Sequence, residues 1–193
     1  MNLPNILTLL RFFLTGIFIF FACQNSLSSA FFALLAFSAA ALTDYFDGYY
    51  ARKHNLITDF GKLMDPIADK FLMLSAFGIF AVQQIFPMWM FVVIAIREIG
   101  ITVWRIIAAH RGITLAAEKT GKIKTVCQIA VAIFILFVHI LVRAGMFPQR
   151  NADLMAVLIC LIWVWMGLVV VLTVWSGAEV LRKSNEKVVG AIT

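Results

Sequence analysis

Charged residues are scarce in this chain of 193 residues. Only 13% of its residues are Asp, Glu, Lys or Arg, whereas 63% are apolar, and the mean hydropathy is +0.97. A soluble domain carries about 25% charged and about 45–50% apolar residues. Because there is too little polar material to cover a water-facing surface, the composition excludes a soluble enzyme and a disordered chain. It indicates a small integral membrane protein.

Cysteine is also rare. The three cysteines, Cys23, Cys127 and Cys160, lie in apolar stretches without a CxxC spacing. This pattern excludes a disulfide scaffold and predicts buried, unreactive thiols. The net charge of +6 does not point to nucleic acid as a partner, because the chain has no soluble basic face and cytoplasmic loops of membrane proteins are rich in Lys and Arg.

Apolar runs fill most of the sequence. A transmembrane helix needs about 20 residues, so six of them would use roughly 120 and leave only short loops. We therefore predict an all-α, polytopic membrane protein with six transmembrane helices in a single domain over residues 1–193. The predicted segments are Leu3–Phe21, Ser29–Tyr50, Pro66–Phe86, Met88–Ile107, Thr125–Val142 and Leu154–Trp175.

Lys and Arg are divided unevenly between the two sets of predicted loops. One set holds only Arg143 and Arg150, whereas the other set and the C-terminal tail hold ten basic residues. Those ten are Arg52, Lys53, Lys62, Arg111, Lys119, Lys122, Lys124, Arg182, Lys183 and Lys187. Since basic residues in short loops stay on the cytoplasmic side, we expect a multi-pass protein of the cell (inner) membrane with both termini in the cytoplasm.

Four of the ten acidic residues lie where the second predicted helix ends and the third begins. Asp44 and Asp47 share one face of the second helix, and Asp65 and Asp69 share one face of the third. A short connection makes these helices antiparallel neighbours, so the four carboxylates should converge. Because like charges repel, two divalent cations would balance them, and oxygen ligands favour Mg²⁺ or Mn²⁺. The alternative is that the acids cap helices and pair with nearby Lys and Arg.

Such a pair of metal ions is a known device for phosphoryl transfer, since the ions clamp the attacking and leaving oxygens. Arg52 lies beside the acids and has the fork geometry that binds a phosphate through two hydrogen bonds. The whole pattern reads Asp44-x-x-Asp47-Gly48-x-x-Ala51-Arg52, then eight residues, then Gly61-x-x-x-Asp65-x-x-x-Asp69. It therefore combines metal ligands, a phosphate-binding cation and small residues that let a ligand approach the backbone.

This pattern resembles the complete signature of the CDP-alcohol phosphotransferase family, and the six-helix layout is similar as well. The resemblance implies an enzyme that moves a phosphatidyl group from a CDP-linked lipid to an alcohol, releases CMP and uses two divalent metals. It also implies a homodimer. The residue roles that it implies are metal binding by Asp44, Asp47, Asp65 and Asp69, general-base catalysis by Asp69, and CDP binding by Gly48, Ala51, Arg52 and Gly61. A shorter match, Pro4-Asn5-x-x-Thr8-x-x-Arg11, implies that Asn5 and Thr8 also lie near the nucleotide.

A cationic cluster on the same predicted side bears on the acceptor alcohol. It suits an acceptor that carries its own phosphate. Arg97 and Glu98, adjacent in the fourth segment, are expected to pair, because two unpaired charges there would be costly. The segments from Arg97 to Arg105 and from Gly121 to Thr125 resemble those of the bacterial branch that makes phosphatidylglycerol phosphate from CDP-diacylglycerol and glycerol 3-phosphate. That resemblance implies that the acceptor phosphate is bound by Arg11, Arg105, Lys122 and Lys124.

Other interpretations stay open at this point. The nearest alternative is an enzyme of the same family with a different acceptor: inositol phosphate, serine or phosphatidylglycerol. A divalent-cation transporter is the alternative from another class, because acids inside a membrane also mark ion pathways. Against the transporter, the acids gather at one face and no acidic relay continues to the other. The positions of the lysines are also explained by membrane topology alone.

Overall fold

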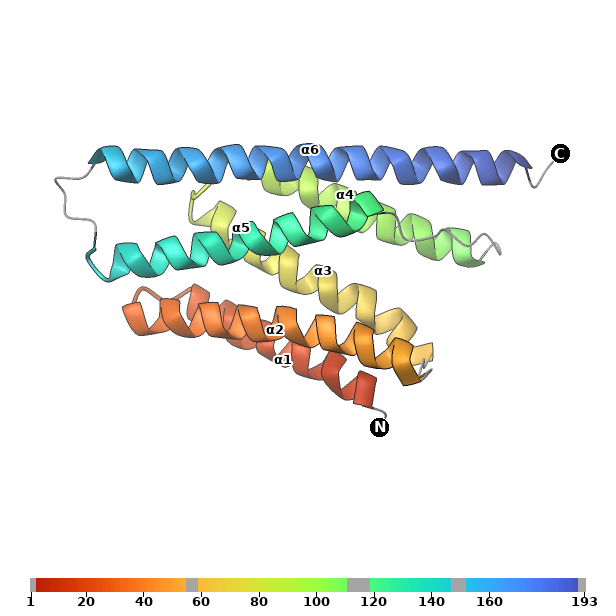
Figure 1. Ribbon diagram of the computed structural model, residues 1–193, viewed down its shortest axis with the longest axis horizontal. Helices are drawn as coiled ribbons and strands as arrows, with labels where there is room; N and C mark the ends of the chain where they lie inside the picture. Colours follow the sequence, from red (N-terminus) through yellow and green to blue (C-terminus); the bar gives the residue numbers. More distant parts are fainter. Residues whose placement is uncertain (1–2, 55–58, 111–118, 147–151, 191–193) are drawn as a thin grey trace.

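The computed structural model is an all-α bundle (Figure 1). It describes the backbone of residues 3–54, 59–110, 119–146 and 152–190, and the side chains of residues 6–43, 67–68, 70–108, 121–146 and 153–182. The described residues form six helices, in the predicted number and order. They are α1 (Leu3–Ala22), α2 (Leu27–His54), α3 (Asp59–Val82), α4 (Met88–His110), α5 (Lys119–Arg143) and α6 (Ala152–Gly190).

Successive helices run in opposite directions along the bundle. The turns that join α1 to α2 and α3 to α4 lie at one end (Figure 1). The start of α1, the end of α2, the end of α4 and the end of α6 all lie toward the other end, which we call the basic end. Helix α5 packs between α2 and α6, and α3 contacts α1 and α4. The fold therefore brings the segments that carry most of the Lys and Arg residues to one end.

Three predicted segments differ from the observed helices by more than a few residues. Helix α3 begins at Asp59 rather than Pro66, α5 begins at Lys119 rather than Thr125, and α6 ends at Gly190 rather than Trp175. Hydropathy marks only the apolar part of a helix, whereas backbone hydrogen bonds continue into polar flanks. At its other end, α3 stops at Val82 because Gln84 takes a left-handed conformation (φ 59°). There Ile85 N–H donates to the Phe80 carbonyl at 3.0 Å, a Schellman closure.

The centre of the bundle is apolar and largely aromatic. Phe18, Phe37 and Phe77 are completely buried, and the Phe18 and Phe37 rings meet edge to face with centroids 5.5 Å apart. These rings come from three different helices, α1, α2 and α3. The core therefore fixes how α1, α2 and α3 pack together. Through this packing it also fixes the positions of the end of α2 and the start of α3.

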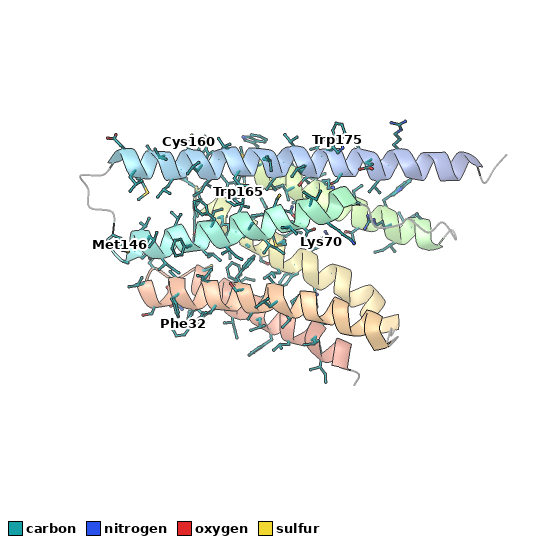
Figure 2. The ribbon with its side chains drawn as sticks, in the orientation of Figure 1. Phe32, Lys70, Met146, Cys160, Trp165 and Trp175 are labelled. Carbon is teal, nitrogen blue, oxygen red and sulfur yellow. The ribbon has the colours of Figure 1, made fainter. Side chains whose placement is uncertain are left out.

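The outer faces of the helices are also apolar. On α6, Trp175 and Cys160 lie on the outer side, whereas Trp165 faces α5 (Figure 2), where its ring packs against Phe134. Trp175 is 68% exposed in the isolated chain. Large exposed apolar faces indicate contact with lipid rather than water. The prediction that the cysteines are buried is wrong for Cys23 and Cys160, which are exposed in the isolated chain, and Cys127 is only half-buried; all three are free thiols.

Two of the described helices are long and apolar enough to cross a membrane, judged by length and composition. They comprise Gly121–Arg143 and Asp153–Arg182, and shorter apolar helices cover Ile6–Ala22, Leu27–Thr43 and Lys70–Val82. Together with the apolar outer faces, these helices indicate a membrane protein. The finer prediction, that six helices span the membrane with both termini in the cytoplasm, stays a prediction.

Candidate active site

The acidic motif lies on two consecutive helices. Helix α2 carries Asp44 and Asp47, and α3 carries Asp65 and Asp69. Spacings of three and four residues place each pair on one face of its helix. The structure does not describe the side chains of these acids. It also does not describe those of five of the six predicted CDP-site residues, Asn5, Gly48, Ala51, Arg52 and Gly61. Their roles as metal ligands, base and nucleotide contacts therefore stay predictions.

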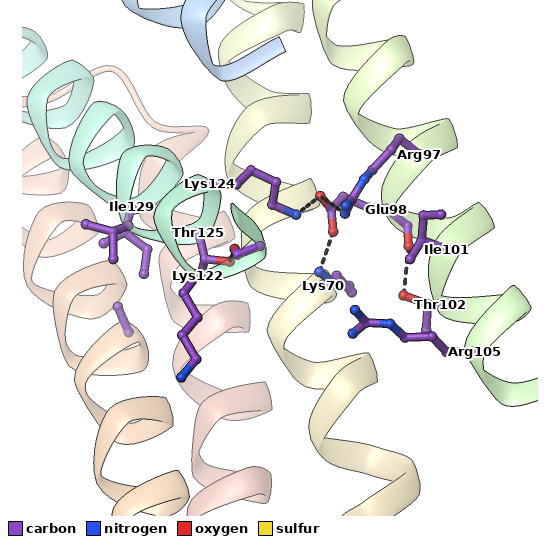
Figure 3. Close-up of a pocket in the computed structure, with 13 residues that line it drawn as sticks. Lys70, Arg97, Glu98, Ile101, Thr102, Arg105, Lys122, Lys124, Thr125 and Ile129 are labelled. Carbon is purple, nitrogen blue, oxygen red and sulfur yellow. Dashed lines mark hydrogen bonds and ion pairs between the residues drawn. The ribbon is translucent and has the colours of Figure 1, made fainter. Parts of the chain in front are cut away.

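A cleft of about 410 Å³ opens beside these helices (Figure 3). It is lined by Ala41, Lys70, Arg97, Glu98, Ile101, Thr102, Arg105, Gly121, Lys122, Lys124, Thr125, Val126 and Ile129. Ala41 lies one helical turn before Asp44 on α2, and Lys70 directly follows Asp69 on α3. The helix positions of the acids therefore adjoin the cleft.

The carboxylate of Glu98 lies at the centre of three cations. Lys124 Nζ donates to Glu98 Oε1, and Lys70 Nζ donates to Oε2. Arg97 Nη1 lies 3.3 Å from Oε1, so the predicted pairing of Arg97 with Glu98 is confirmed. Glu98 is only 2% exposed, and a buried carboxylate is stable only when it is paired and hydrogen-bonded. This cluster links α3, α4 and α5 beside the cleft.

Arg97 also connects α4 to α6. Its Nη2 atom donates to Ser176 Oγ at 2.7 Å. The side chain passes close to Gly177, where an added Cβ would lie 3.2 Å from Arg97 Cγ. Sequence reasoning missed Lys70 and Ser176 as partners in this cluster. The available signals were the position of Lys70 next to an acid and the small residues that interrupt the apolar run of α6.

Two further cations line the cleft without an ion-pair partner among the side chains that the structure describes. Arg105 extends from α4 toward Lys70, and Lys122 extends from α5 away from Glu98 (Figure 3). Among the described side chains of the lining, five are basic and one is acidic. Such an excess of positive charge favours an anionic ligand, and phosphate in particular.

A smaller chamber of about 80 Å³ adjoins the cleft. The two cavities share Ala41, Lys70, Glu98, Thr125 and Ile129, and the chamber adds Arg11, Leu72, Met73 and Gln128. Arg11 is completely buried, and Thr8, one turn earlier on α1, is 1% exposed. The structure thus places three of the four predicted acceptor-phosphate residues, Arg105, Lys122 and Lys124, in the cleft and the fourth, Arg11, in the chamber.

Comparison with known proteins identifies the family. The family model described as CDP-alcohol phosphatidyltransferase matches residues 1–175. The chain belongs to this family. This confirms the resemblance inferred from the acidic motif, and it makes the chain an enzyme and a transferase.

Relatives within the family carry more specific names. A CDP-diacylglycerol–glycerol-3-phosphate 3-phosphatidyltransferase of Bacillus subtilis is 41% identical over 150 residues, which cover 72% of this chain and 77% of the relative. A probable phosphatidylglycerophosphate synthase of Mycobacterium tuberculosis is 39% identical over 139 residues, 70% of this chain and 66% of the relative. An enzyme of Rickettsia felis with the same name as the Bacillus relative is 38% identical over 137 residues, 70% of this chain and 75% of that protein.

The CDP-alcohol phosphatidyltransferase family uses a divalent metal. The donor set of this chain fits such an ion, because carboxylate oxygens are the ligands that hard divalent cations prefer and the helix positions of the acids adjoin the cleft. Among the described side chains, which do not include the four Asp residues, no group of three or more His, Cys, Asp or Glu gathers.

Proposed function

We propose that the chain transfers the phosphatidyl group of CDP-diacylglycerol to glycerol 3-phosphate and releases phosphatidylglycerol phosphate and CMP. The names of relatives that are about 40% identical over about 70% of the chain support this reaction. The observation that favours an acceptor with its own phosphate is the excess of positive charge among the described side chains of the cleft, and the names of the relatives favour glycerol 3-phosphate among such acceptors. A phosphate-bearing alcohol matches that charge, whereas serine does not.

The two substrates would occupy neighbouring parts of the site. The acceptor phosphate would lie among the cationic side chains of Arg105, Lys122 and Lys124, with Arg11 in the adjoining chamber. Arg105 and Lys122 are its direct contacts, because Glu98 already holds Lys124. The nucleotide would bind on the α1–α2–α3 side, at Asn5, Thr8, Gly48, Ala51, Arg52 and Gly61.

In this proposal, the reaction needs one proton acceptor and one route for the leaving group. Asp69 takes the proton from the acceptor hydroxyl, and the hydroxyl oxygen attacks the β-phosphorus of CDP-diacylglycerol. The bond from that phosphorus to the CMP oxygen breaks, and Arg52 stabilises the departing phosphate. Asp44, Asp47, Asp65 and Asp69 would hold two Mg²⁺ or Mn²⁺ ions, which supply charge neutralisation at the phosphates when bound.

The site would face the cytoplasm. We infer a single domain over residues 1–193, with six spans in the cell (inner) membrane, both termini in the cytoplasm and a homodimer as the assembly. The ends of α2, α4 and α6 lie together at the basic end (Figure 1), which agrees with the loop charges. A lipid bound there keeps its diphosphate at headgroup level while its acyl chains lie among the apolar helices.

CMP release tests the proposal. Purified protein in detergent is given CDP-diacylglycerol and one acceptor at a time: glycerol 3-phosphate, inositol phosphate, serine or phosphatidylglycerol. Of these four acceptors, only glycerol 3-phosphate is expected to cause release of CMP. CMP with a different acceptor would overturn the acceptor assignment. No CMP with any acceptor, together with metal uptake into vesicles that contain the protein, would favour the transporter instead.

A further inference from the structure

A buried amide next to the cleft has no role in the site described so far. Gln128, on α5, is 2% exposed and lines the chamber beside Glu98. Within the part of the chain that the structure describes, its Nε2 atom has no hydrogen-bond partner. A buried donor without a partner is destabilising, so such groups are normally satisfied by a neighbour or a ligand.

The register of α5 connects this amide to the proposed acceptor site. Lys124 and Gln128 are four residues apart and therefore lie on one face of the helix. Thr125, on the same face, lines both the cleft and the chamber. A small molecule that places its phosphate at Arg105 in the cleft can therefore extend across Thr125 and reach Gln128.

The two cavities differ in size more than in charge. Cationic side chains, which bind phosphate, line both of them: five described side chains in the cleft and Arg11 and Lys70 in the chamber. The chamber, at about 80 Å³, is much smaller, so it takes a small polar group rather than a whole substrate. Gln128 offers that group a neutral N–H donor, which suits a hydroxyl oxygen.

We propose that Gln128 is a specificity residue that binds the hydroxyl on carbon 2 of glycerol 3-phosphate. This inference rests on the proposed function. Of the three substituents of glycerol 3-phosphate, the phosphate is bound in the cleft and the reacting hydroxyl must face Asp69. The hydroxyl on carbon 2 is the one that remains, and Gln128 Nε2–H donates to it.

An acceptor that lacks only this hydroxyl provides the test. CMP release is measured with glycerol 3-phosphate and with the monophosphate of 1,3-propanediol, using wild-type protein and Gln128→Met, which has similar length without the amide. We expect wild-type protein to prefer glycerol 3-phosphate by roughly 10-fold or more in kcat/KM, about the value of one hydrogen bond. Gln128→Met should lose this preference through a higher KM for glycerol 3-phosphate, with the KM for CDP-diacylglycerol unchanged.

Gln83→Met is the matched control. Gln83 lies at the opposite end of the bundle, where its Nε2 donates to the Ala22 carbonyl at 2.9 Å, and its substitution should leave the preference intact. Equal use of the two acceptors by wild-type protein would overturn the inference without any variant. An equal loss with both acceptors in Gln128→Met would also overturn it, because it would assign Gln128 a structural role. If wild-type protein releases no CMP with glycerol 3-phosphate, the proposed function fails, and this inference fails with it.

Discussion

Glu98 and Lys124 form an ion pair between α4 and α5 in which both side chains are almost completely buried. The second carboxylate oxygen of Glu98 accepts a hydrogen bond from Lys70 of α3. One acid thus holds two ammonium groups that would otherwise repel each other. Because all three side chains line the cleft, the pair contributes to the shape and the charge of the proposed acceptor site.

Removal of the Glu98 charge should destabilise the bundle. Glu98→Gln keeps the shape of the side chain but leaves Lys70 and Lys124 without their anion. Breaking a buried ion pair on one side costs about 3–5 kcal/mol, so denaturant titration in detergent should show a loss of that size. The matched control is Asp153→Asn, an exposed acid of α6, for which a change within about 0.5 kcal/mol is expected. If Glu98→Gln has the same free energy of unfolding as the wild-type protein, the cluster does not hold the helices together.

This cluster shows which contacts the sequence could reveal. The pairing of Arg97 with Glu98 was predictable, because the two residues are adjacent and an unpaired charge in an apolar helix is costly. Lys70 and Lys124 lie 28 and 26 residues away from Glu98. Their contact with it depends on which faces α3 and α5 turn toward α4, and this follows from packing of the whole bundle rather than from local spacing.

The same distinction applies to the fold. Six helices were predictable because long apolar runs are unmistakable in a chain with so few charges. The end of α3 was not, since it depends on a left-handed residue, and Gln84 is not one that usually marks such a position. Gln128 was overlooked for a related reason: a single amide in an apolar helix has no spacing motif, and only the chamber beside it suggests a ligand.

The two cations without an ion-pair partner in the described cleft should control acceptor affinity. Arg105→Gln and Lys122→Gln each remove one charge-assisted hydrogen bond to the proposed phosphate. We expect each to raise the KM for glycerol 3-phosphate by roughly 10-fold or more. The KM for CDP-diacylglycerol should stay unchanged, as measured by CMP release at varied concentrations of each substrate.

Arg143→Gln is the control for these two substitutions. Arg143 bonds Asn25 at 2.8 Å on an exposed surface far from the cleft, so neither KM should change. If Arg105→Gln raises the KM for CDP-diacylglycerol instead, the cleft binds the nucleotide lipid and the two substrate positions are reversed.

Two glycines of α6 provide a comparison within one helix. A Cβ at Gly177 would meet Arg97 Cγ and Nε at 3.2 Å, whereas a Cβ at Gly167 would meet nothing within 4 Å. Gly177→Ala should displace Arg97 from Ser176 and cost about 1 kcal/mol or more in unfolding free energy, as overpacking does. Gly167→Ala should gain roughly 0.5–1 kcal/mol through its better helix propensity. Equal effects on denaturant midpoints would show that Arg97 adjusts without cost.

Chelation tests the proposed metal requirement. If the four Asp residues hold two divalent ions, excess EDTA should abolish CMP release, and Mg²⁺ or Mn²⁺ should restore it. Ca²⁺, which prefers more ligands and longer distances than Mg²⁺, is expected to restore activity poorly. Full activity in EDTA would rule out an exchangeable metal in the reaction.

The last prediction concerns the proposed base. Asp69→Asn keeps the shape of the side chain but removes its ability to accept a proton, and general-base catalysis contributes typically about 10²–10⁴-fold to a rate. CMP release should therefore fall by at least about 100-fold, while the protein still binds CDP-diacylglycerol in an equilibrium binding assay. Asp153→Asn again serves as the control and should keep full activity. Retained turnover in Asp69→Asn would remove its role as base. Loss of lipid binding along with turnover would instead assign Asp69 to substrate or metal binding, with the proton accepted by another group.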